Sequence, residues 1–425
     1  MSESLRRLYK NINISGKPIE KEIEENTEKY RKGDFTVRLP DGLKAISIKV
    51  KQIKHSFMFG ANTFMLDSFD SAEKNESYKE HFLKLFNTAV VGTFWKDYEP
   101  KKGEFRFDKN SHFVYRRPPV DSVLDFCKEN GLTPKAHNLI WHRKSMQPDW
   151  LDSDHTKIMP DILDYMTALS GRYNDVFKYI DVANEHLCRG RIGQWGNDEM
   201  PDNYVYEAFK AADKLFKNSK LLTNENHMNV WVDYCLDSSP YYIYLQSLIS
   251  HGCRVDSIGM QYHAFISKVH EEWFGTGMMD IECIDKVLKG YGSFNKPIQI
   301  SEITIPSTLF GEKTDEGLQR EITENLFRLW FSNPNAEAII WWNLSDGAAF
   351  ENEDEFKGAL LRSDMSEKPV YEMLDRLINK EWHTEEAVNA SEDGSFNFRG
   401  FYGEYEISAE TDKGTYNFKK TFKRE

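Results

Sequence analysis

The sequence lacks several features that define whole classes of protein. Its five cysteines lie far apart and none forms a C-x-x-C pair. This spacing argues against a disulfide framework or a structural zinc site and favours buried, reduced thiols. No run of about 18 apolar residues occurs, so no transmembrane helix is expected. Neither G-x-G-x-x-G nor G-x-x-x-x-G-K-S is present, so the common phosphate-binding loops are missing and no cofactor is expected.

Charge and the amino-terminal sequence indicate which partners and which cellular location to expect. The 425 residues carry 68 acidic and 55 basic side chains, interspersed, for a net charge of -13. Nucleic acid and anionic membranes are therefore not expected as partners. The first twenty residues contain neither an apolar core nor a small-residue cleavage site, so they do not form a signal peptide as written. This predicts a cytoplasmic protein, although a secreted protein that had lost its leader would give the same sequence. No feature indicates an oligomeric state.

The central part of the chain alternates between two kinds of segment. From about residue 56, short apolar runs are separated by longer stretches with helical spacing, such as 120–131, 202–218 and 314–333. Eight such runs occur, at 57–62, 88–95, 133–141, 179–185, 220–226, 257–263, 296–303 and 336–344. This order predicts a (β/α)₈ TIM barrel over residues 56–383. A doubly wound open sheet is the alternative, but such sheets more often carry a glycine-rich phosphate loop.

The two ends of the chain predict a small accessory β unit. Residues 1–55 suggest a helix and then a β-hairpin, because apolar and polar residues alternate on both sides of Pro40-Asp41-Gly42. Residues 384–425 suggest further short strands. We expect the two segments to pack together, since neither alone would bury much apolar area. The aromatic stretch 398–405 suits either a carbohydrate-binding surface or, as the favoured interpretation, the core between this sheet and the barrel.

Polar and aromatic side chains gather at the predicted carboxyl ends of the strands. In a barrel of this type that end carries the active site, and a purely structural end would have no need of such a set. Its members are Asn62, Trp95, His137, Trp141, His142, Asn184, Glu185, Asn224, Gln261, His263, Glu302, Trp342 and Asp346.

Two carboxylates in this set, Glu185 and Glu302, predict a specific chemistry. Glycoside hydrolysis uses one carboxylic acid to protonate the leaving oxygen and a second carboxylate to attack or to activate water. Asn184 directly precedes Glu185 and could bind a substrate hydroxyl. An Asn-Glu pair alone is common in solvated loops, but here "VANE" ends one predicted strand and "ISEI" lies at the end of another.

A family resemblance rests on eight stretches that occur in order over residues 56–380. They are "FWKDYEPKKGEFRFD", "AHNLIWH…QPDWL", "DVANE", "LLTNEN", "GMQYH", "ISEI", "WWNLSD" and "GALLRSDMSEKPVYEML". The chain resembles glycoside hydrolase family 10, the retaining endo-1,4-β-xylanases built on a (β/α)₈ barrel. The resemblance implies that Glu185 is the general acid/base and Glu302 the nucleophile. It further implies that Asn184 contacts the sugar 2-hydroxyl and that His263 orients Glu302.

The resemblance also implies a set of substrate-binding residues. His137 would bind a hydroxyl in the glycone subsite, with Trp141 and Trp342 as walls of that subsite. Gln261 and Trp95, at other strand ends, are expected to bind substrate as well. The first predicted strand lacks the His-x-His pattern of metallohydrolase barrels, so no metal is expected.

The second predicted strand departs from the family pattern. Typical members carry an Asn and a Lys there that hold glycone hydroxyls, whereas this chain has Val91 and Phe94. Phe350 stands where the family has a second Trp, and His186 follows Glu185 in place of a small residue. The resemblance implies a β-linked, xylan-type polysaccharide or oligosaccharide as substrate, while these departures support a retaining β-glycosidase more strongly than an endo-xylanase. The alternatives are a retaining β-glycosidase for a decorated or deoxy sugar and a carbohydrate-binding barrel without turnover.

Overall fold

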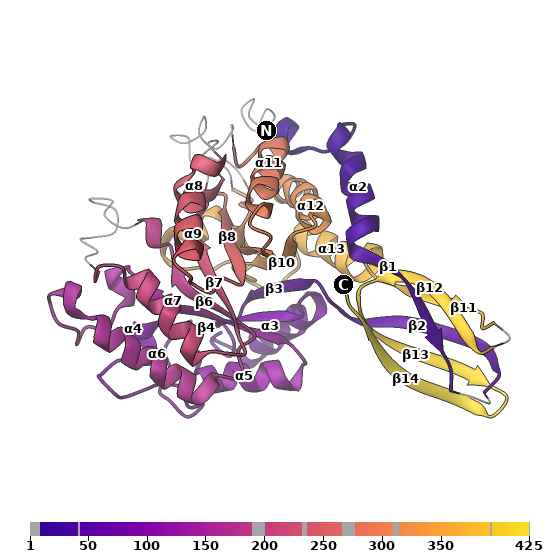
Figure 1. The fold of residues 1–425 in the computed structure, drawn as a ribbon, viewed down its shortest axis with the longest axis horizontal. Coiled ribbons are helices and arrows are strands. Elements are labelled where there is room, and N and C mark those ends of the chain that lie inside the picture. Colours follow the sequence, from indigo (N-terminus) through magenta and orange to yellow (C-terminus); the bar gives the residue numbers. More distant parts are fainter. Residues whose placement is uncertain are drawn as a thin grey trace.

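A computed structural model describes residues 9–40, 43–188, 200–231, 236–265, 277–308, 314–391 and 393–424. Figure 1 shows a large body of strands surrounded by helices, with a smaller unit of antiparallel strands at its side. The first and last segments of the chain meet in that smaller unit.

Eight parallel strands close into a barrel in the order β10-β3-β4-β5-β6-β7-β8-β9. This closure confirms the predicted (β/α)₈ barrel and excludes the open sheet. Both faces of each strand are covered, which is why the strands are near-continuous apolar runs rather than alternating ones. Their bounds are β3 Met58–Asn62, β4 Thr88–Gly92, β5 Thr133–Trp141, β6 Tyr179–Asn184, β7 Lys220–Glu225, β8 Ser257–His263, β9 Ile298–Thr304 and β10 Ala336–Trp341.

Helices of the outer layer follow the strands. In α12 (Glu316–Ser332) the side chains of Leu318, Ile322 and Leu326 are buried on one stripe, and Asp315 caps the first turn by accepting from the Leu318 N–H. The helix ends before Asn333-Pro334 because proline cannot continue it. The other helices are α3 Ala72–Leu85, α4 Trp95–Tyr98, α5 Val120–Glu129, α6 Met159–Tyr173, α7 Tyr204–Leu215, α8 His227–Val230, α9 Pro240–Ser250, α11 Ile281–Gly292 and α13 Pro369–Arg376.

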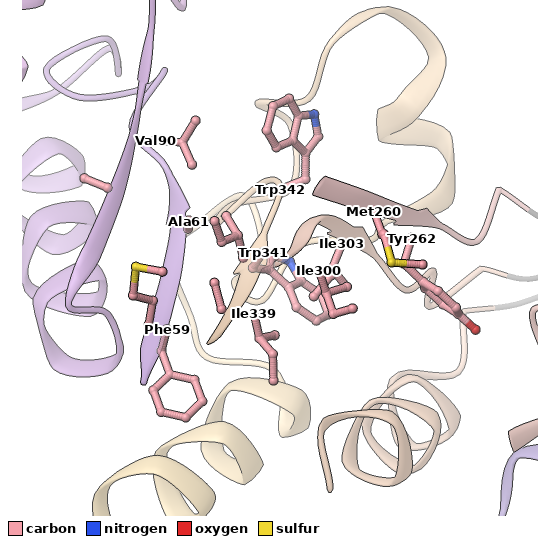
Figure 2. Close-up of a cluster of buried hydrophobic side chains, with 14 of the residues drawn as sticks. Phe59, Ala61, Val90, Met260, Tyr262, Ile300, Ile303, Ile339, Trp341 and Trp342 are labelled. Atoms are coloured by element: carbon pink, nitrogen blue, oxygen red, sulfur yellow. The ribbon is translucent and has the colours of Figure 1, made fainter. Parts of the chain in front are cut away.

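The end of β10 divides its side chains between the core and the upper rim of the barrel. Figure 2 shows Trp341 beside Ile300 and Ile303, whereas Trp342 stands apart on the other side of the strand end. The Trp341 ring packs on Phe327 of α12, with 6.2 Å between ring centroids. Neighbouring residues of a strand face opposite sides, so Trp341 fills the layer between barrel and helices and Trp342 is left for the rim.

The accessory unit is made of two antiparallel sheets, which corrects the predicted hairpin. β1 (Lys32–Arg38) pairs with β12 (Ser395–Phe401), while β2 (Ala45–His55) belongs to the second sheet, in the order β11-β2-β13-β14. The N-terminal strands therefore do not pair with each other. The remaining strands are β11 Glu385–Val388, β13 Gly403–Thr411 and β14 Gly414–Phe422.

A shared apolar core explains why the hairpin does not form. Phe35 of β1 contacts Phe398 of β12 and Tyr405 of β13, with centroid distances of 5.2 and 6.2 Å. Ile48 and Val50 of β2 are buried in the same cluster. Alternation in β1 and β2 thus marks two strands that face each other across a sandwich core, not two strands side by side. Of the rings in 398–405, Phe398 and Tyr405 are buried in this core, whereas Phe401 is buried in the core cluster of the barrel.

The helix α2 (Pro18–Arg31) joins the accessory unit to the barrel. At its end the buried Arg31 guanidinium donates to the carbonyl oxygens of Phe331, Asn333 and Ala336. These carbonyls belong to the end of α12 and the start of β10, so one side chain links both parts. Within the described ranges, no helix is both long and apolar enough to cross a bilayer. The described thiols of Cys127, Cys253 and Cys283 are free.

Candidate active site

A cavity opens at the carboxyl ends of the barrel strands. It brings together seven of the nine side chains that the sequence predicts for the site: His137, Trp141, Asn184, Glu185, His263, Glu302 and Trp342. They come from β5, β6, β8, β9 and the segments directly after β6 and β10. Residues that are far apart in the sequence therefore meet because parallel strands end at the same rim.

Glu302 is held in place by donors from two neighbouring strands. Its Oε1 accepts from Asn224 Nδ2 at 2.6 Å and from Gln261 Nε2 at 3.1 Å. Its Oε2 lies 3.1 Å from His263 Nε2. The other ring nitrogen of His263 lies 2.9 Å from the Thr304 hydroxyl, which can donate to it and leave the Nε2 proton for Glu302. Both carboxylate oxygens thus have fixed partners before any substrate binds.

Asn224 at the end of β7 connects the two strands that carry the carboxylates. Its Nδ2 donates to Glu302 and also to Asn184 Oδ1, the latter at 2.8 Å. The Ser301 hydroxyl donates to Asn224 Oδ1 and fixes the orientation of the amide. Gln261 Nε2 makes a second, 3.3 Å bond to Asn184 Oδ1. The Oδ1 atom of Asn184 therefore already accepts two hydrogen bonds, and its NH₂ group is left to donate to a ligand.

Glu185 follows β6 at a sharp change of backbone direction. Its φ is +51°, in the left-handed region that costs a non-glycine residue free energy. Its backbone N–H donates to the Asn224 carbonyl at 2.8 Å, which holds this conformation. The strand thus ends in a turn that places the second carboxyl in the same cavity as Glu302.

Burial shifts the pKa values of both carboxyl groups upward. Burial raises the pKa of Glu302 to about 7, although His137 and the Asn224 hydrogen bond act to lower it. Burial and the nearby charge of Glu302 raise the pKa of Glu185. Two carboxyl groups in such a site favour holding one proton between them. That is the state in which one acts as an acid and the other as a nucleophile.

A buried ion pair orients His137. Asp181 lies 3.0 Å from Lys135 Nζ and 2.9 Å from His137 Nδ1, and Lys135 and Asp181 are each 1% exposed. Burial acts to raise the pKa of Asp181, but Lys135 and His137 outweigh it and the pKa is lowered. The ionised carboxylate fixes the imidazole, so Asp181 supports the site from beneath.

His186, the unusual residue after Glu185, belongs to a second buried pair. Its Nδ1 lies 3.2 Å from Glu225 Oε2, and Glu225 also accepts from the N–H groups of Leu187 and Asn226. Burial raises the pKa of Glu225 to about 8 and lowers that of His186 to about 3. The pair joins η3 (His186–Cys188) to the end of β7 and so supports the turn at Glu185.

Aromatic rings form one side of the cavity. Trp342 meets His137 at 5.2 Å and Phe64 at 5.3 Å between centroids, and Phe94 lies 5.5 Å from His137. Phe94, one of the departures in the second strand region, therefore faces the cavity. Val91 is fully buried and does not line it.

Two predicted residues do not line the cavity. Gln261 is fully buried and acts on Glu302 and Asn184 from beneath. Trp95 begins α4, where its indole N–H donates to Glu99 at 2.6 Å and its ring stacks on Tyr165 at 5.6 Å. The prediction that Trp95 binds substrate is thus corrected: a helix begins directly after the strand and turns this ring into the helix layer.

Sequence reasoning missed a pair of arginines in the cavity. Arg116 and Arg117 precede α5, and both line the cavity beside Phe64 and Phe94. They lie outside any strand end, so the alternation of strands and helices gives no reason to select them. The sole signal is two adjacent basic residues between Tyr115 and a Pro-Pro pair.

A family of known proteins matches most of this chain. The family described as "Glycosyl hydrolase family 10" matches residues 50–376, which include both Glu185 and Glu302. The chain belongs to glycosyl hydrolase family 10. Membership confirms the resemblance drawn from the motifs.

The curated relatives of this chain are distant in sequence. "Anti-sigma-I factor RsgI6" of Acetivibrio thermocellus is 24% identical over 402 residues, covering 93% of this chain and 47% of that protein. "Endo-1,4-beta-xylanase 1" of Arabidopsis thaliana is 24% identical and covers 92% of this chain and 38% of its own length. The chain thus spans less than half the length of these relatives.

Solved structures of family 10 xylanases share the fold. Xylanase 10B from Thermotoga maritima superposes with a TM-score of 0.59 at 21% identity, over 77% of this chain and 96% of that one. Xylanase 10B from Thermotoga petrophila RKU-1, solved in complex with xylobiose, gives a TM-score of 0.56 at 18% identity, over 77% and 95%. The barrel is common to all three chains.

Proposed function

We propose that the protein is a retaining glycoside hydrolase for β-linked, xylan-type glycans. One observation carries the proposal: Glu185 and Glu302 line a single cavity and are tied into one hydrogen-bond network through Asn224. Such a pair of carboxyls, one able to hold a proton and one with fixed donors, is what the double-displacement reaction requires.

In the first step Glu302 attacks the anomeric carbon of the bound sugar. The bond from that carbon to the leaving oxygen breaks, and Glu185 transfers its proton to that oxygen. A covalent glycosyl ester on Glu302 results. In the second step the Glu185 carboxylate takes a proton from water, and the hydroxide oxygen attacks the anomeric carbon and releases Glu302. Glu185 ends protonated, so the cycle closes.

The surrounding donors suit this reaction. His263 and Asn224 contact opposite oxygens of Glu302 and hold it for attack. Asn184 offers its NH₂ group on the cavity side, where a hydrogen bond to a sugar hydroxyl would strengthen in the transition state. His137, fixed by Asp181, would hold a glycone hydroxyl beside Trp342.

The names of relatives support the substrate class. Several relatives are named endo-1,4-beta-xylanases, and one solved neighbour holds xylobiose. A xylan-type chain is therefore the first substrate to test. Because Phe94 lines the cavity, a decorated or deoxy sugar in the glycone position is the second.

A panel of aryl β-glycosides tests the proposal: xyloside, xylobioside, glucoside, glucuronide, fucoside and arabinoside. Wild type is expected to release the aryl group from at least one member, and Glu302→Gln to lose that release by about 10⁴-fold or more, since it removes the nucleophile. Glu337→Gln is the matched control, because it alters a largely buried glutamate at the start of β10, at the opposite end of the barrel. Its activity per folded molecule should stay close to that of wild type. Activity that persists in Glu302→Gln would contradict the proposal.

The rival function is a carbohydrate-binding barrel without turnover. A relative that covers 93% of this chain is named an anti-sigma factor, so proteins similar to this one are not all named as enzymes. In this chain both carboxyls and their donors are present, which favours hydrolysis. Binding of xylo-oligosaccharides by wild type with no release of reducing sugar would favour the rival.

A further inference from the structure

An arginine in the cavity has a charge that no carboxylate in the described residues directly neutralises. Arg116 is 5% exposed and lines the cavity. Its Nη2 makes a long, 3.4 Å hydrogen bond to Asn343 Oδ1. Its Nε and Nη1 find no hydrogen-bond partner in the described part of the chain, and no described carboxylate oxygen lies within 4 Å of the guanidinium.

Leaving such a group unpaired costs free energy. A buried charge without a partner is among the most destabilising features a protein can keep. The two other arginines that line the cavity differ in this respect. Arg117 pairs with Asp97 at 2.7 Å, and Arg143 pairs with Glu351 at 3.1 Å. Arg116 is thus the member of the three whose donors remain for a ligand.

Glu353 is a carboxylate whose charge acts on Arg116, and an amide separates the two. Asn343 accepts from Arg116 at its Oδ1 and donates from its Nδ2 to Glu353 Oε2 at 3.2 Å. Burial raises the pKa of Glu353, although Arg116 acts to lower it.

Arg116 lies near the proposed glycone subsite. Its guanidinium lies 5.9 Å from the Phe64 ring, and that of Arg117 lies 4.2 Å from the Phe94 ring. Phe64 and Phe94 both adjoin His137 and so flank the proposed glycone subsite. The family's polar pair on the second strand is absent here, and arginines from the segment before α5 supply donors in the same neighbourhood.

We propose that this end of the cavity binds a negatively charged sugar unit, a uronic acid whose carboxylate pairs with the guanidinium of Arg116. The proposal rests on the function above, because it names the substrate class for the same site. A sulfate ester would share the oxyanion chemistry. The carboxylate is the better match, since its two oxygens fit the planar guanidinium fork side by side.

The test uses the inactive Glu302→Gln protein and titration calorimetry with three ligands. They are a glucuronic-acid-substituted xylotetraose, the same oligosaccharide with its carboxyl group reduced to an alcohol, and a sulfated xylotetraose. The acidic oligosaccharide is expected to bind about tenfold or more tightly than the reduced one, as charge-assisted hydrogen bonds typically give. Tighter binding of the sulfated ligand would keep the anion site and assign it to a sulfate ester. Equal binding of all three, or no binding of either acid ligand at millimolar concentration, would overturn the proposal.

Added to this background, Arg116→Gln should abolish the preference for the acidic ligand and leave binding of the reduced ligand within about twofold. Arg172→Gln is the matched control: it removes the same charge at an exposed ion pair with Asp121 outside the cavity, and the preference should persist. If Arg116→Gln does not fold, Glu353→Gln takes its place. Removing the carboxyl that faces Arg116 should tighten binding of the acidic ligand alone, and unchanged or weaker binding would count against the proposal.

The two proposals fail in different ways. If Glu302→Gln still hydrolyses aryl glycosides, the proposed mechanism is wrong whatever the ligand preference. If Glu302→Gln is inactive and binds acidic and reduced oligosaccharides equally, the mechanism stands and the uronic acid site alone is wrong.

Discussion

Two regions of the cavity are built in opposite ways. The floor, taken together with Asn224 and Gln261 directly beneath it, consists of Asn184, Glu185, His263 and Glu302. These residues lie at or directly after strand ends and bond to one another. The wall consists of Phe64, Phe94, Arg116 and Arg117, which lie on the segments between elements. In the floor each carboxylate oxygen of Glu302 already has a partner, whereas Arg116 in the wall keeps unused donors. The residues of the floor are preorganised for the reaction, and those of the wall are suited to determining which ligand binds.

The largest expected effect separates the two roles within the floor. Glu185→Ala should lower kcat/KM for an unactivated xylo-oligosaccharide by about 10²–10⁴-fold, the usual contribution of a general acid. An aryl glycoside with a good leaving group needs little protonation, so its first step should be much less affected. Pre-steady-state release of the aryl group measures that step directly.

The comparison requires that the same step, glycosylation, limits the rate for both substrates. If glycosylation limits both substrates and both lose rate equally, Glu185 is not the acid. Glu302→Gln should show no such discrimination between leaving groups, because the nucleophile acts on both.

Beneath the floor, Asp181→Asn should cost about 3–5 kcal/mol of unfolding free energy, because it leaves Lys135 buried without a counter-charge. Urea denaturation at pH 7 measures the loss. The double variant Lys135→Met with Asp181→Asn should recover much of it, since no buried charge then remains. A loss below about 1 kcal/mol in the single variant would mean that the pair is not desolvated as described.

The pH profile tests how the floor tunes its nucleophile. Glu302 must be ionised to attack, and its pKa is raised to about 7, so kcat/KM should fall as the pH drops through neutrality. Asn224→Ala removes a hydrogen bond that favours the charged form, so the pKa should rise and the acidic limb should move upward by about one pH unit. Asn343→Ala, an amide on the side of the wall, should leave that limb in place. If the acidic limb of the kcat/KM profile were unchanged in Asn224→Ala, the limb would report the titration of a group other than Glu302.

The smallest expected effect concerns a tryptophan that looked functional in the sequence. Trp95→Phe removes an indole donor to Glu99 outside the cavity, so kcat/KM should stay within about twofold and stability should fall by about 1 kcal/mol. Trp342→Ala, in contrast, removes a ring that lines the cavity and should raise KM markedly. Steady-state kinetics on one aryl glycoside compares them, and equal losses would contradict the placement of Trp95 in the helix layer.

The floor could be predicted from the sequence because strand periodicity locates strand ends. Glu185 lies at the end of "YIDVANE" and Glu302 lies near the end of "KPIQISEI". These two positions predict that both residues lie at one rim, since parallel strands of a barrel end together. Asn224, by contrast, appeared among the strand-end residues but gave no hint that it joins both carboxylate strands. That property depends on which strands are neighbours and on side-chain direction.

The wall and the accessory unit show what periodicity does not provide. Arg116 reaches the cavity through an irregular segment, and nothing in local spacing indicates where such a segment goes. The prediction of a hairpin at Pro40 was wrong for a related reason. Alternation in 32–38 and 45–55 identifies strands with one apolar face, but partners are chosen by the core they share, here with the C-terminal strands.

The proposed double displacement requires that Glu302 forms a covalent bond to the sugar. Incubation with 2,4-dinitrophenyl 2-deoxy-2-fluoro-β-xylobioside, followed by proteolysis and mass spectrometry, tests it directly, because the fluorine slows breakdown of the glycosyl ester. One sugar adduct is expected on the peptide that contains Glu302, and none on the same peptide of Glu302→Gln. An adduct on Glu185, or no adduct while the parent xylobioside is hydrolysed, would contradict it.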